Sequence, residues 1–283
     1  MTASLKEADR LVALVEASGI RLCVAHPARY DAGFLQMKKM VESGDIGKPL
    51  TVYGRGKSDH RGGGEDMMVL GTHIFDLQTF FFGEPEAAWA EVTCDGRPIG
   101  RGDTGETVEP IGPTAGDDIF ACFRFPGGVR ALFESRRGLV DLARQETHMG
   151  IAVIGTAGTL SLRFDDIGDA RLRISPLSSP PDADACFEEV DVVDERSVPA
   201  AAPLDDSLRG AQTPRARLFL GSNRYAAWDL IRSIEEDRLP VSNMYNARLA
   251  LEMIYAVYAS QLSGGVIRFP LTDREHPLER KQS

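Results

Sequence analysis

Residues 119–135, IFACFRFPGGVRALFES, hold two strand-like runs on either side of Pro126, Gly127 and Gly128. Alternation of apolar and polar side chains predicts strands, and a glycine-rich interruption is typical of the turn in a β-hairpin. Residues 150–154 and 159–164 flank a second turn, residues 155–158, in the same way. The two hairpins predict an antiparallel sheet.

Helices are predicted where apolar residues recur with the helical period. The four segments are residues 4–18, 32–43, 223–237 and 245–262. Ser4 and Glu7 form a capping box at the start of the first segment, and Gly19 ends it. On the third segment, the residues expected to face inward are Ala226, Leu230, Ile231 and Ile234.

The remaining segments complete the expected secondary structure. Strands are predicted at residues 49–58 and 266–270. Residues 175–213 are rich in Pro, Ala, Ser and Asp, so we expect them to run over the surface, with one strand-like patch at 187–193. Asp66 is expected to cap the helix that contains His73.

The N-terminal 45 residues have a different pattern. Residues 20–25 are an apolar run without alternation, which is typical of a strand buried on both faces of a parallel sheet. We therefore predict an α/β (α+β) fold, in which a remnant of a doubly wound Rossmann domain, residues 1–45, precedes residues 46–283. The second part is a large, mostly antiparallel open sheet with helices on one side. The lone strand, without parallel neighbours, is expected to be labile.

Composition excludes several classes of partner. The 42 acidic and 32 basic residues give a net charge of -10, which argues against binding to nucleic acid or an anionic membrane. No apolar run approaches the roughly 20 residues of a transmembrane helix, and the start lacks a cationic signal-peptide region, so a cytoplasmic protein is expected. Cys23, Cys94, Cys122 and Cys186 lack metal-ligand spacing, and we predict reduced thiols and no metal site.

One histidine stands out, because residues 62–77, GGGEDMMVLGTHIFDL, place His73 in an otherwise apolar helix. It is either a buried base or a core histidine whose ring nitrogens are satisfied by hydrogen bonds. Asp76, three residues later, either fixes the tautomer of the imidazole or anchors local structure. The glycines at 54, 56 and 62–64 do not follow a buried strand or open a long helix. They predict turns, and we expect the dinucleotide-binding motif to be missing.

Five blocks in order resemble the Gfo/Idh/MocA family, named for glucose-fructose oxidoreductase and inositol dehydrogenase. They cover nearly the whole chain, and they are ADRLVALVEASGIRLCVAHPARYDAGF, VESGDIGKPL, GGG to GTHIFDL, IGTAGTLSL and SNMYNARLALEMIYAVYASQLSGGVIRFPL. The resemblance implies an NAD- or NADP-dependent oxidoreductase acting on a sugar, cyclitol or related polyol. It also implies a C-terminal substrate domain whose open sheet often forms a homo-oligomer.

The resemblance also implies roles for particular residues. His73 matches the histidine of the family's Asp-x-x-x-His pair, which removes the proton of the substrate hydroxyl. Arg29 and Tyr30 match the cleft loop, although an interdomain packing pair is equally compatible. Lys57 and Asp59 approach the same cleft unless they are a solvated strand end, and Asp76 is counted with them as a candidate substrate residue.

The chain departs from the family pattern at three points. We expect the family's GxGxxG motif and its Glu-Lys-Pro lysine to be missing, and Val69 stands where the aspartate is expected. Two hypotheses follow. Either this is the substrate portion of a dehydrogenase that acts with a nucleotide-binding domain, or it is a non-catalytic carbohydrate-binding or subunit-interface module.

Overall fold

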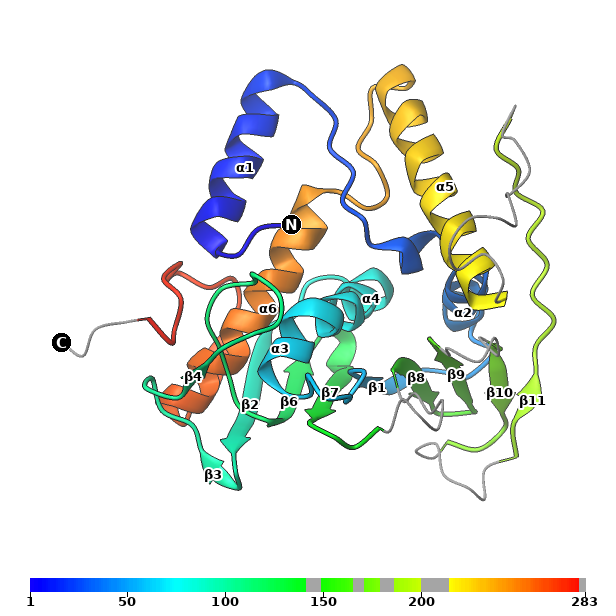
Figure 1. Cartoon of the computed structure of the whole chain (residues 1–283). Coiled ribbons are helices and arrows are strands. Elements are labelled where there is room, and N and C mark those ends of the chain that lie inside the picture. Colours follow the sequence, from blue (N-terminus) through cyan, green and yellow to red (C-terminus); the bar gives the residue numbers. More distant parts are fainter. Residues whose placement is uncertain (141–148, 165–170, 179–185, 200–213, 280–283) are drawn as a thin grey trace.

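A single large sheet organises the protein (Figure 1). The structure is a computed structural model that describes residues 1–140, 149–164, 171–178, 186–199 and 214–279, without the side chains of 214–219. Nine strands lie in the order β11-β10-β9-β8-β1-β7-β6-β2-β12, with β3 paired to β2, and β4 and β5 form a separate pair. Among the described helices none is long and apolar enough to cross a lipid bilayer.

The strands have the following bounds: β1 Pro49–Arg55, β2 Ala87–Cys94, β3 Arg97–Pro98, β4 Thr104–Gly105, β5 Thr114–Ala115, β6 Asp118–Arg124, β7 Arg130–Arg136, β8 Gly150–Gly155, β9 Thr159–Arg163, β10 Arg173–Ser175, β11 Glu188–Glu189 and β12 Ile267–Arg268. The helices are α1 Leu5–Ser18, η1 Pro27–Tyr30, α2 Ala32–Ser43, α3 Gly64–Asp66, the π-helix η2 Met67–Gly71, α4 Thr72–Phe82, η3 Pro126–Gly128, α5 Pro214–Glu235 and α6 Met244–Ser263.

Both predicted hairpins are confirmed. β6 pairs antiparallel with β7 around the turn at Pro126–Gly128, and β8 pairs antiparallel with β9. β1 lies between the hairpins, parallel to β7 and antiparallel to β8. The mostly antiparallel open sheet is therefore as predicted, although β1 ends at Arg55 rather than at Ser58.

Helices cover one face of the sheet (Figure 1). α6 packs on β2 and α4, α4 packs on β1, and α1 packs on α6. The strand residues that face these helices are buried, for example Val52, Ala121, Phe133 and Val153. Their neighbours along each strand point to the opposite face, where Trp89 is 43% and Phe120 38% exposed. The alternation follows from the period of two in a strand.

Local capping signals agree with the structure at the helix ends. Ser4 and Glu7 form the predicted capping box, and Gly19 ends α1 in the left-handed conformation. The side chain of Asp31 accepts hydrogen bonds from the backbone N–H groups of Gly33 and Phe34 at the start of α2. Asn243 and Asn246 form a second capping box at α6. Each cap satisfies N–H groups that a helix start leaves unpaired.

The prediction of a strand at residues 20–25 is wrong. The segment forms a single isolated bridge, between Cys23 and Asn243, and the N–H of Val24 donates to the carbonyl of Ser242. Ile20 is 55% exposed, so the segment is not buried on both faces. An apolar run alone does not make a buried strand when its partner is an irregular segment rather than a sheet. The division of the chain at residue 45 stays a prediction.

Two further expectations about the second half of the chain need correction. α5 begins at Pro214, and Ile231 and Ile234 are 47% and 62% exposed rather than inward-facing, because the helix packs on η1 through another face. In the predicted surface segment, β11 covers only Glu188–Glu189 of the patch at 187–193. Residues 179–185 and 200–213 of that segment lie outside the described residues.

Candidate functional site

A cavity of about 580 Å³ contains His73. Its walls come from the segment before η1, the junction of η2 and α4, α6, and the loop between β4 and β5. Most of its lining is apolar. Its polar side chains are Thr2, Cys23, His26, Thr72, His73 and Glu109.

The π-helix η2 brings Val69 and His73 to this cavity. In a π-helix the backbone hydrogen bonds close over one more residue than in an α-helix, so a turn contains an extra residue. Met68, Val69, Thr72 and His73 consequently all line the cavity from one short stretch. The place of the family's aspartate is therefore occupied by an isopropyl side chain.

Asp76 does not act on His73 in the way the spacing suggests. Its Oδ1 lies 2.8 Å from Nδ1 of His26, and Nε of Arg29 donates to its two oxygens at 2.9 and 2.8 Å. Arg29 also donates to the carbonyl of Asp76 and to the hydroxyl of Thr79. Asp76 is fully buried and Arg29 nearly so. The carboxylate therefore anchors the segment of His26 and η1 to α4.

The pKa values of Asp76 and His73 are both lowered, but for different physical reasons. Burial alone would raise the pKa of Asp76, but the positive charge and hydrogen bonds of His26 and Arg29 lower it to about 2. Burial, with a smaller contribution from His26, lowers the pKa of His73 to about 4. The rings of His26 and His73 meet edge to face with centroids 5.5 Å apart. At neutral pH His73 is an uncharged imidazole beside an ionised, fully paired carboxylate.

Tyr30 lies outside this cavity. Its hydroxyl donates to Asp229 at 2.9 Å and accepts from the N–H of Ser242 at 3.1 Å. Burial raises the pKa of this hydroxyl well above its usual value. Tyr30 thus joins η1 to α5 and to the start of α6, and its predicted contact with substrate stays a prediction.

Lys57 and Asp59 reach the cavity only through other residues. Nζ of Lys57 lies 3.8 Å from Asp59, and Asp59 is buried and accepts three hydrogen bonds from Arg61. Arg61 also donates to Glu109 at 3.1 Å, and Glu109 lines the cavity. Against the desolvation of burial, the guanidinium of Arg61 lowers the pKa of Asp59. Arg61 therefore links Asp59 to Glu109, which lines the same cavity as His73.

His26 and Glu109 are the cavity residues that the sequence does not reveal. His26 stands beside Pro27 in a short irregular segment, and Glu109 in a loop of low hydrophobicity. Neither has periodicity or motif spacing that indicates a site. For His26 the available signal was its place in the block VAHPARY, three residues before Arg29.

The glycine triplet serves close packing. A Cβ at Gly62 would lie 2.3 Å from the backbone of Arg137, and a Cβ at Gly63 or Gly64 would lie 2.3 or 2.4 Å from the backbone of residues 115–116. Asp66 does not cap a helix as predicted. Its carboxylate instead accepts from Ser135 and from the N–H groups of Lys57 and Ser58, which follow the end of β1 at Arg55.

One glycine pattern contradicts the expectation that the GxGxxG spacing is missing from the sequence. Gly100, Gly102 and Gly105 do have the GxGxxG spacing. Gly100 and Gly102 lie between the two-residue strands β3 and β4, and Gly105 is the last residue of β4. The N–H of Gly100 donates to Asp103, which also pairs with Arg97. A pyrophosphate needs a helix N-terminus behind such a loop, and no helix follows here. The motif therefore occurs without the structure that makes it bind a dinucleotide.

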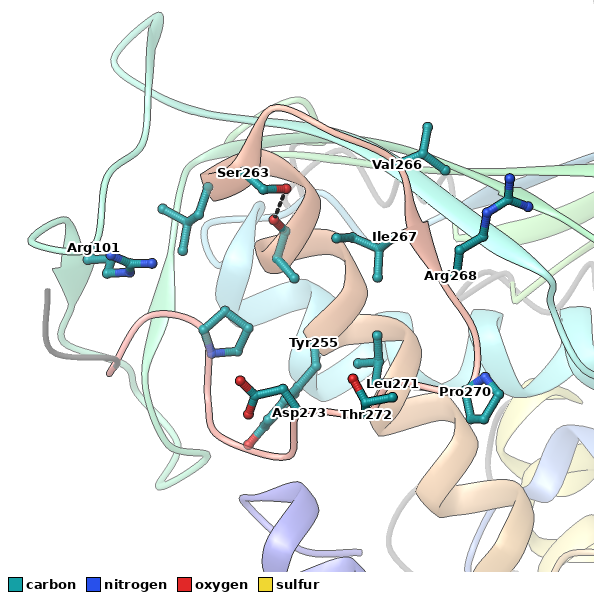
Figure 2. A pocket seen from close by; sticks show the side chains of 13 residues that line it. Arg101, Tyr255, Ser263, Val266, Ile267, Arg268, Pro270, Leu271, Thr272 and Asp273 are labelled. Carbon is teal, nitrogen blue, oxygen red and sulfur yellow. Dashed lines mark hydrogen bonds between the residues drawn. The ribbon is translucent and has the colours of Figure 1, made fainter. Parts of the chain in front are cut away.

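A second cavity, of about 420 Å³, lies between α6 and the segment that follows it (Figure 2). Arg101 and Arg268 lie on opposite sides of it (Figure 2). None of the residues predicted for the site lines it. Elsewhere, Cys94, Asp95 and Asp117 bring three possible ligand atoms within 4.8 Å of one another on a partly exposed surface, and the four cysteines are free thiols.

The sequence has recognisable relatives. A family model described as the GFO/IDH/MocA C-terminal domain matches residues 34–161. The chain is also 28% identical over 120 residues to scyllo-inositol 2-dehydrogenase (NADP(+)) IolW of Bacillus subtilis (strain 168). That match covers 38% of this chain and 32% of the relative, so it spans about a third of the relative's length.

Solved structures share the fold over almost the whole chain. Levoglucosan dehydrogenase in complex with NADH and levoglucosan is 16% identical, with a TM-score of 0.65 over 95% of this chain and 71% of that one. The aldose-aldose oxidoreductase of Caulobacter crescentus, complexed with glycerol, is 18% identical, with a TM-score of 0.64 over 95% of this chain and 70% of that one. At such identities the likeness establishes the fold.

Proposed function

Because the chain belongs to the Gfo/Idh/MocA family through residues 34–161, we propose that it serves an oxidoreductase as its substrate domain. The proposed substrate is a sugar, cyclitol or related polyol, and the proposed redox partner is NAD or NADP. The observation that carries the proposal is the cavity in which His73 lies beside the cluster of His26, Asp76 and Arg29.

His73 is suited to receive the proton of a substrate hydroxyl. Its low pKa keeps the ring uncharged at neutral pH, so that a ring nitrogen has a free lone pair. In the proposed step the O–H bond breaks, its electron pair stays on oxygen, and the proton forms an N–H bond on His73. Most of the residues that line the rest of the cavity are apolar.

Glu109 is proposed to bind a second hydroxyl of the substrate. It is the carboxylate that lines the cavity among the described residues, and Arg61 holds it at 3.1 Å. A carboxylate accepts hydrogen bonds from hydroxyls, and such charge-assisted bonds are stronger than neutral ones. Glu109 thus supplies, from the loop between β4 and β5, the carboxylate that the side chain of Val69 lacks.

The residues described here do not fit the phosphates of a dinucleotide. Residues 20–25 join no parallel sheet, the loop at Gly100–Gly105 precedes no helix, and backbone atoms fill the space around Gly62–Gly64. We therefore assign no step to the nicotinamide. The relatives do not decide between NAD and NADP, since levoglucosan dehydrogenase is in complex with NADH and IolW is an NADP(+) enzyme by name.

Self-association through the open sheet is part of the proposal. On the face opposite the helices, Trp89, Cys122, Leu132 and Tyr53 stand opposite one another on four adjacent strands, and Ala152 continues the row. The adjacent row contains Phe120, Glu134 and Arg55, of which the last two form an ion pair. An apolar row beside charged side chains fits the interface of a homodimer.

Val69 favours a second candidate, a carbohydrate-binding module without redox chemistry. The test is to join the protein to a nucleotide-binding domain, to incubate it with NAD+ or NADP+ and a panel that includes scyllo-inositol and levoglucosan, and to follow the absorbance of reduced nicotinamide. Calorimetry measures polyol binding in parallel. Turnover supports the oxidoreductase, and binding without turnover supports the module. If no polyol binds and none is oxidised, both candidates are wrong.

A further inference from the structure

A third cavity, of about 720 Å³, lies apart from the cavity that contains His73, and no described residue lines both. Its walls come from η1, α2, the end of α4, the segment after β11, α5 and the connection from α5 to α6. Its volume is within the range of about 300–1,000 Å³ that is typical of small-molecule sites. A ligand here is therefore independent of the proposed oxidoreductase chemistry.

The charge of this cavity is opposite to that of the whole chain. The chain has 42 acidic and 32 basic residues. Of the described residues that line the cavity, in contrast, the acidic ones are Glu42 and Asp229, and the basic ones are Arg29, Lys38, Lys39, Arg196, Arg232 and Arg238. A concave site lined by one sign of charge attracts ligands of the opposite sign. The cavity therefore favours an anion.

The basic side chains differ in how firmly the fold holds them. Arg29 is paired with the buried carboxylate of Asp76, and removing a partner from a buried ion pair is costly. Arg232 pairs with Glu235 on the surface of α5, and exposed pairs contribute little to stability. Lys39 is exposed and has no ion pair or hydrogen bond within the described part of the chain. Arg232 and Lys39 can therefore turn to a ligand at little cost.

Aromatic side chains form another part of the cavity wall. The ring centroid of Phe80 lies 5.0 Å from the charged ends of two basic side chains, and that of Tyr225 lies 4.1 Å from the guanidinium of Arg196. Trp228 differs, because neither a ring contact nor a hydrogen bond of its indole N–H is found among the described residues. An indole supplies a flat apolar face and one N–H donor.

The helix α5 brings this indole close to a positive charge. Trp228 and Arg232 are four residues apart and both line the cavity. Residues at this spacing share a face of a helix, about one turn or 5.4 Å apart along the axis. A ring that stacks on Trp228 consequently has its substituent within reach of the guanidinium of Arg232. Lys39 lines the same cavity from α2.

We propose that this cavity binds a small molecule that carries a planar ring and an anionic group, as nucleoside monophosphates and aromatic carboxylates do. The ring stacks on Trp228, and the anionic group accepts hydrogen bonds from Arg232 and Lys39. Guanidinium and ammonium groups bind phosphate and carboxylate through charge-assisted hydrogen bonds, which are stronger than neutral ones.

Calorimetry with the whole chain tests both halves of the ligand. The probes are AMP and benzoate, each beside its uncharged analogue, adenosine or benzamide, together with inorganic phosphate. We expect AMP, benzoate or both to bind, and the uncharged analogues and phosphate to bind at least roughly tenfold more weakly. Binding of AMP alone identifies nucleotides as the ligand class, and binding of benzoate alone identifies aromatic carboxylates. If neither binds, or if an uncharged analogue binds as tightly as its charged counterpart, the proposal is wrong.

Fluorescence shows whether the probe occupies this cavity. The chain has two tryptophans, Trp89 and Trp228, so Trp89→Phe leaves the indole of the cavity as the one that emits. We expect its emission to change and saturate over the concentrations at which calorimetry detects binding. Emission that does not change during binding would place the probe elsewhere and overturn the proposal.

Replacements of exposed charges test the anionic contact without disturbing the core. Lys39→Gln and Arg232→Gln should each weaken the binding of the charged probe roughly tenfold. Arg124→Gln is the control, because Arg124 pairs with Glu86 on the surface and does not line the cavity. Wild-type affinity in both Lys39→Gln and Arg232→Gln would overturn the assignment of the anionic group to this cavity.

Discussion

Oδ1 of Asp76 lies 2.8 Å from Nδ1 of His26, and Nε of Arg29 reaches the same carboxylate from η1. The three side chains are buried, and Asp76 is far in the sequence from His26 and Arg29. Asp76 therefore joins the N-terminal segment to α4. The stability of this region depends on this buried carboxylate.

Arg29→Ala is expected to destabilise the fold by roughly 3–5 kcal/mol, because it removes the guanidinium that is paired with the buried carboxylate of Asp76. Urea unfolding measures the change. Arg232→Ala is the matched control, since Arg232 pairs with Glu235 on the surface of α5 and such pairs contribute about 0–1 kcal/mol. Equal losses in the two variants would contradict the anchoring role of Asp76.

Stability is expected to fall as the pH drops from 6.5 towards 4. The folded-state pKa values of His73 and His276 are lowered by burial to about 4, against an ordinary value of 6.5. Within this window the unfolded chain binds protons that the folded chain does not, so the free energy of unfolding decreases. Above pH 6.5 these two residues cause no pH dependence. Urea unfolding at several pH values measures the slope.

Single replacements show which residues cause this dependence of the free energy of unfolding on pH. His73→Gln and His276→Gln should each flatten the curve between pH 6.5 and 4, and His60→Gln, on an exposed ring, should not. Asp76 contributes in a lower window, because its folded pKa is about 2 against 3.8. The stabilisation it gives is present above pH 3.8 and is lost as the pH falls to 2. A slope that persists in both buried-histidine variants would show that other groups cause it.

Glu109→Gln is expected to raise the KM for a polyol roughly tenfold with little change in kcat, since a charge-assisted hydrogen bond to substrate becomes a neutral one. Initial rates over a range of polyol concentrations measure both constants. Glu106→Gln, an exposed residue of the same loop, is the control. A KM that does not change in the first variant would remove Glu109 from the substrate site.

Trp89→Lys is expected to convert the proposed dimer into a folded monomer, because it places a charge in the apolar row of the open sheet. Sedimentation velocity measures the mass in solution. Leu14→Lys, at a more exposed apolar residue of α1, should leave the mass unchanged. A monomeric wild-type protein would contradict the proposed homodimer.

The sequence predicts those features of the fold that depend only on residues close together in the chain. The hairpin around Pro126–Gly128 and the capping box of Ser4 and Glu7 depend on neighbouring residues, and both are found in the structure. Residues 20–25 have the composition of a buried strand but meet only an irregular segment, and composition does not report the partner. His26 was missed for a similar reason, because its contact with Asp76 exists only after the chain has folded.

The most direct test of the account is the rate of NAD(P)-dependent polyol oxidation by His73→Ala beside that of His60→Ala, with each variant joined to the same nucleotide-binding domain. If His73 takes the hydroxyl proton, kcat falls roughly 100-fold or more in the first variant, as expected for loss of a general base. The second variant, whose ring is 68% exposed, keeps the wild-type rate. An undiminished kcat in His73→Ala would contradict the account and return His73 to a packing role in the wall of the cavity.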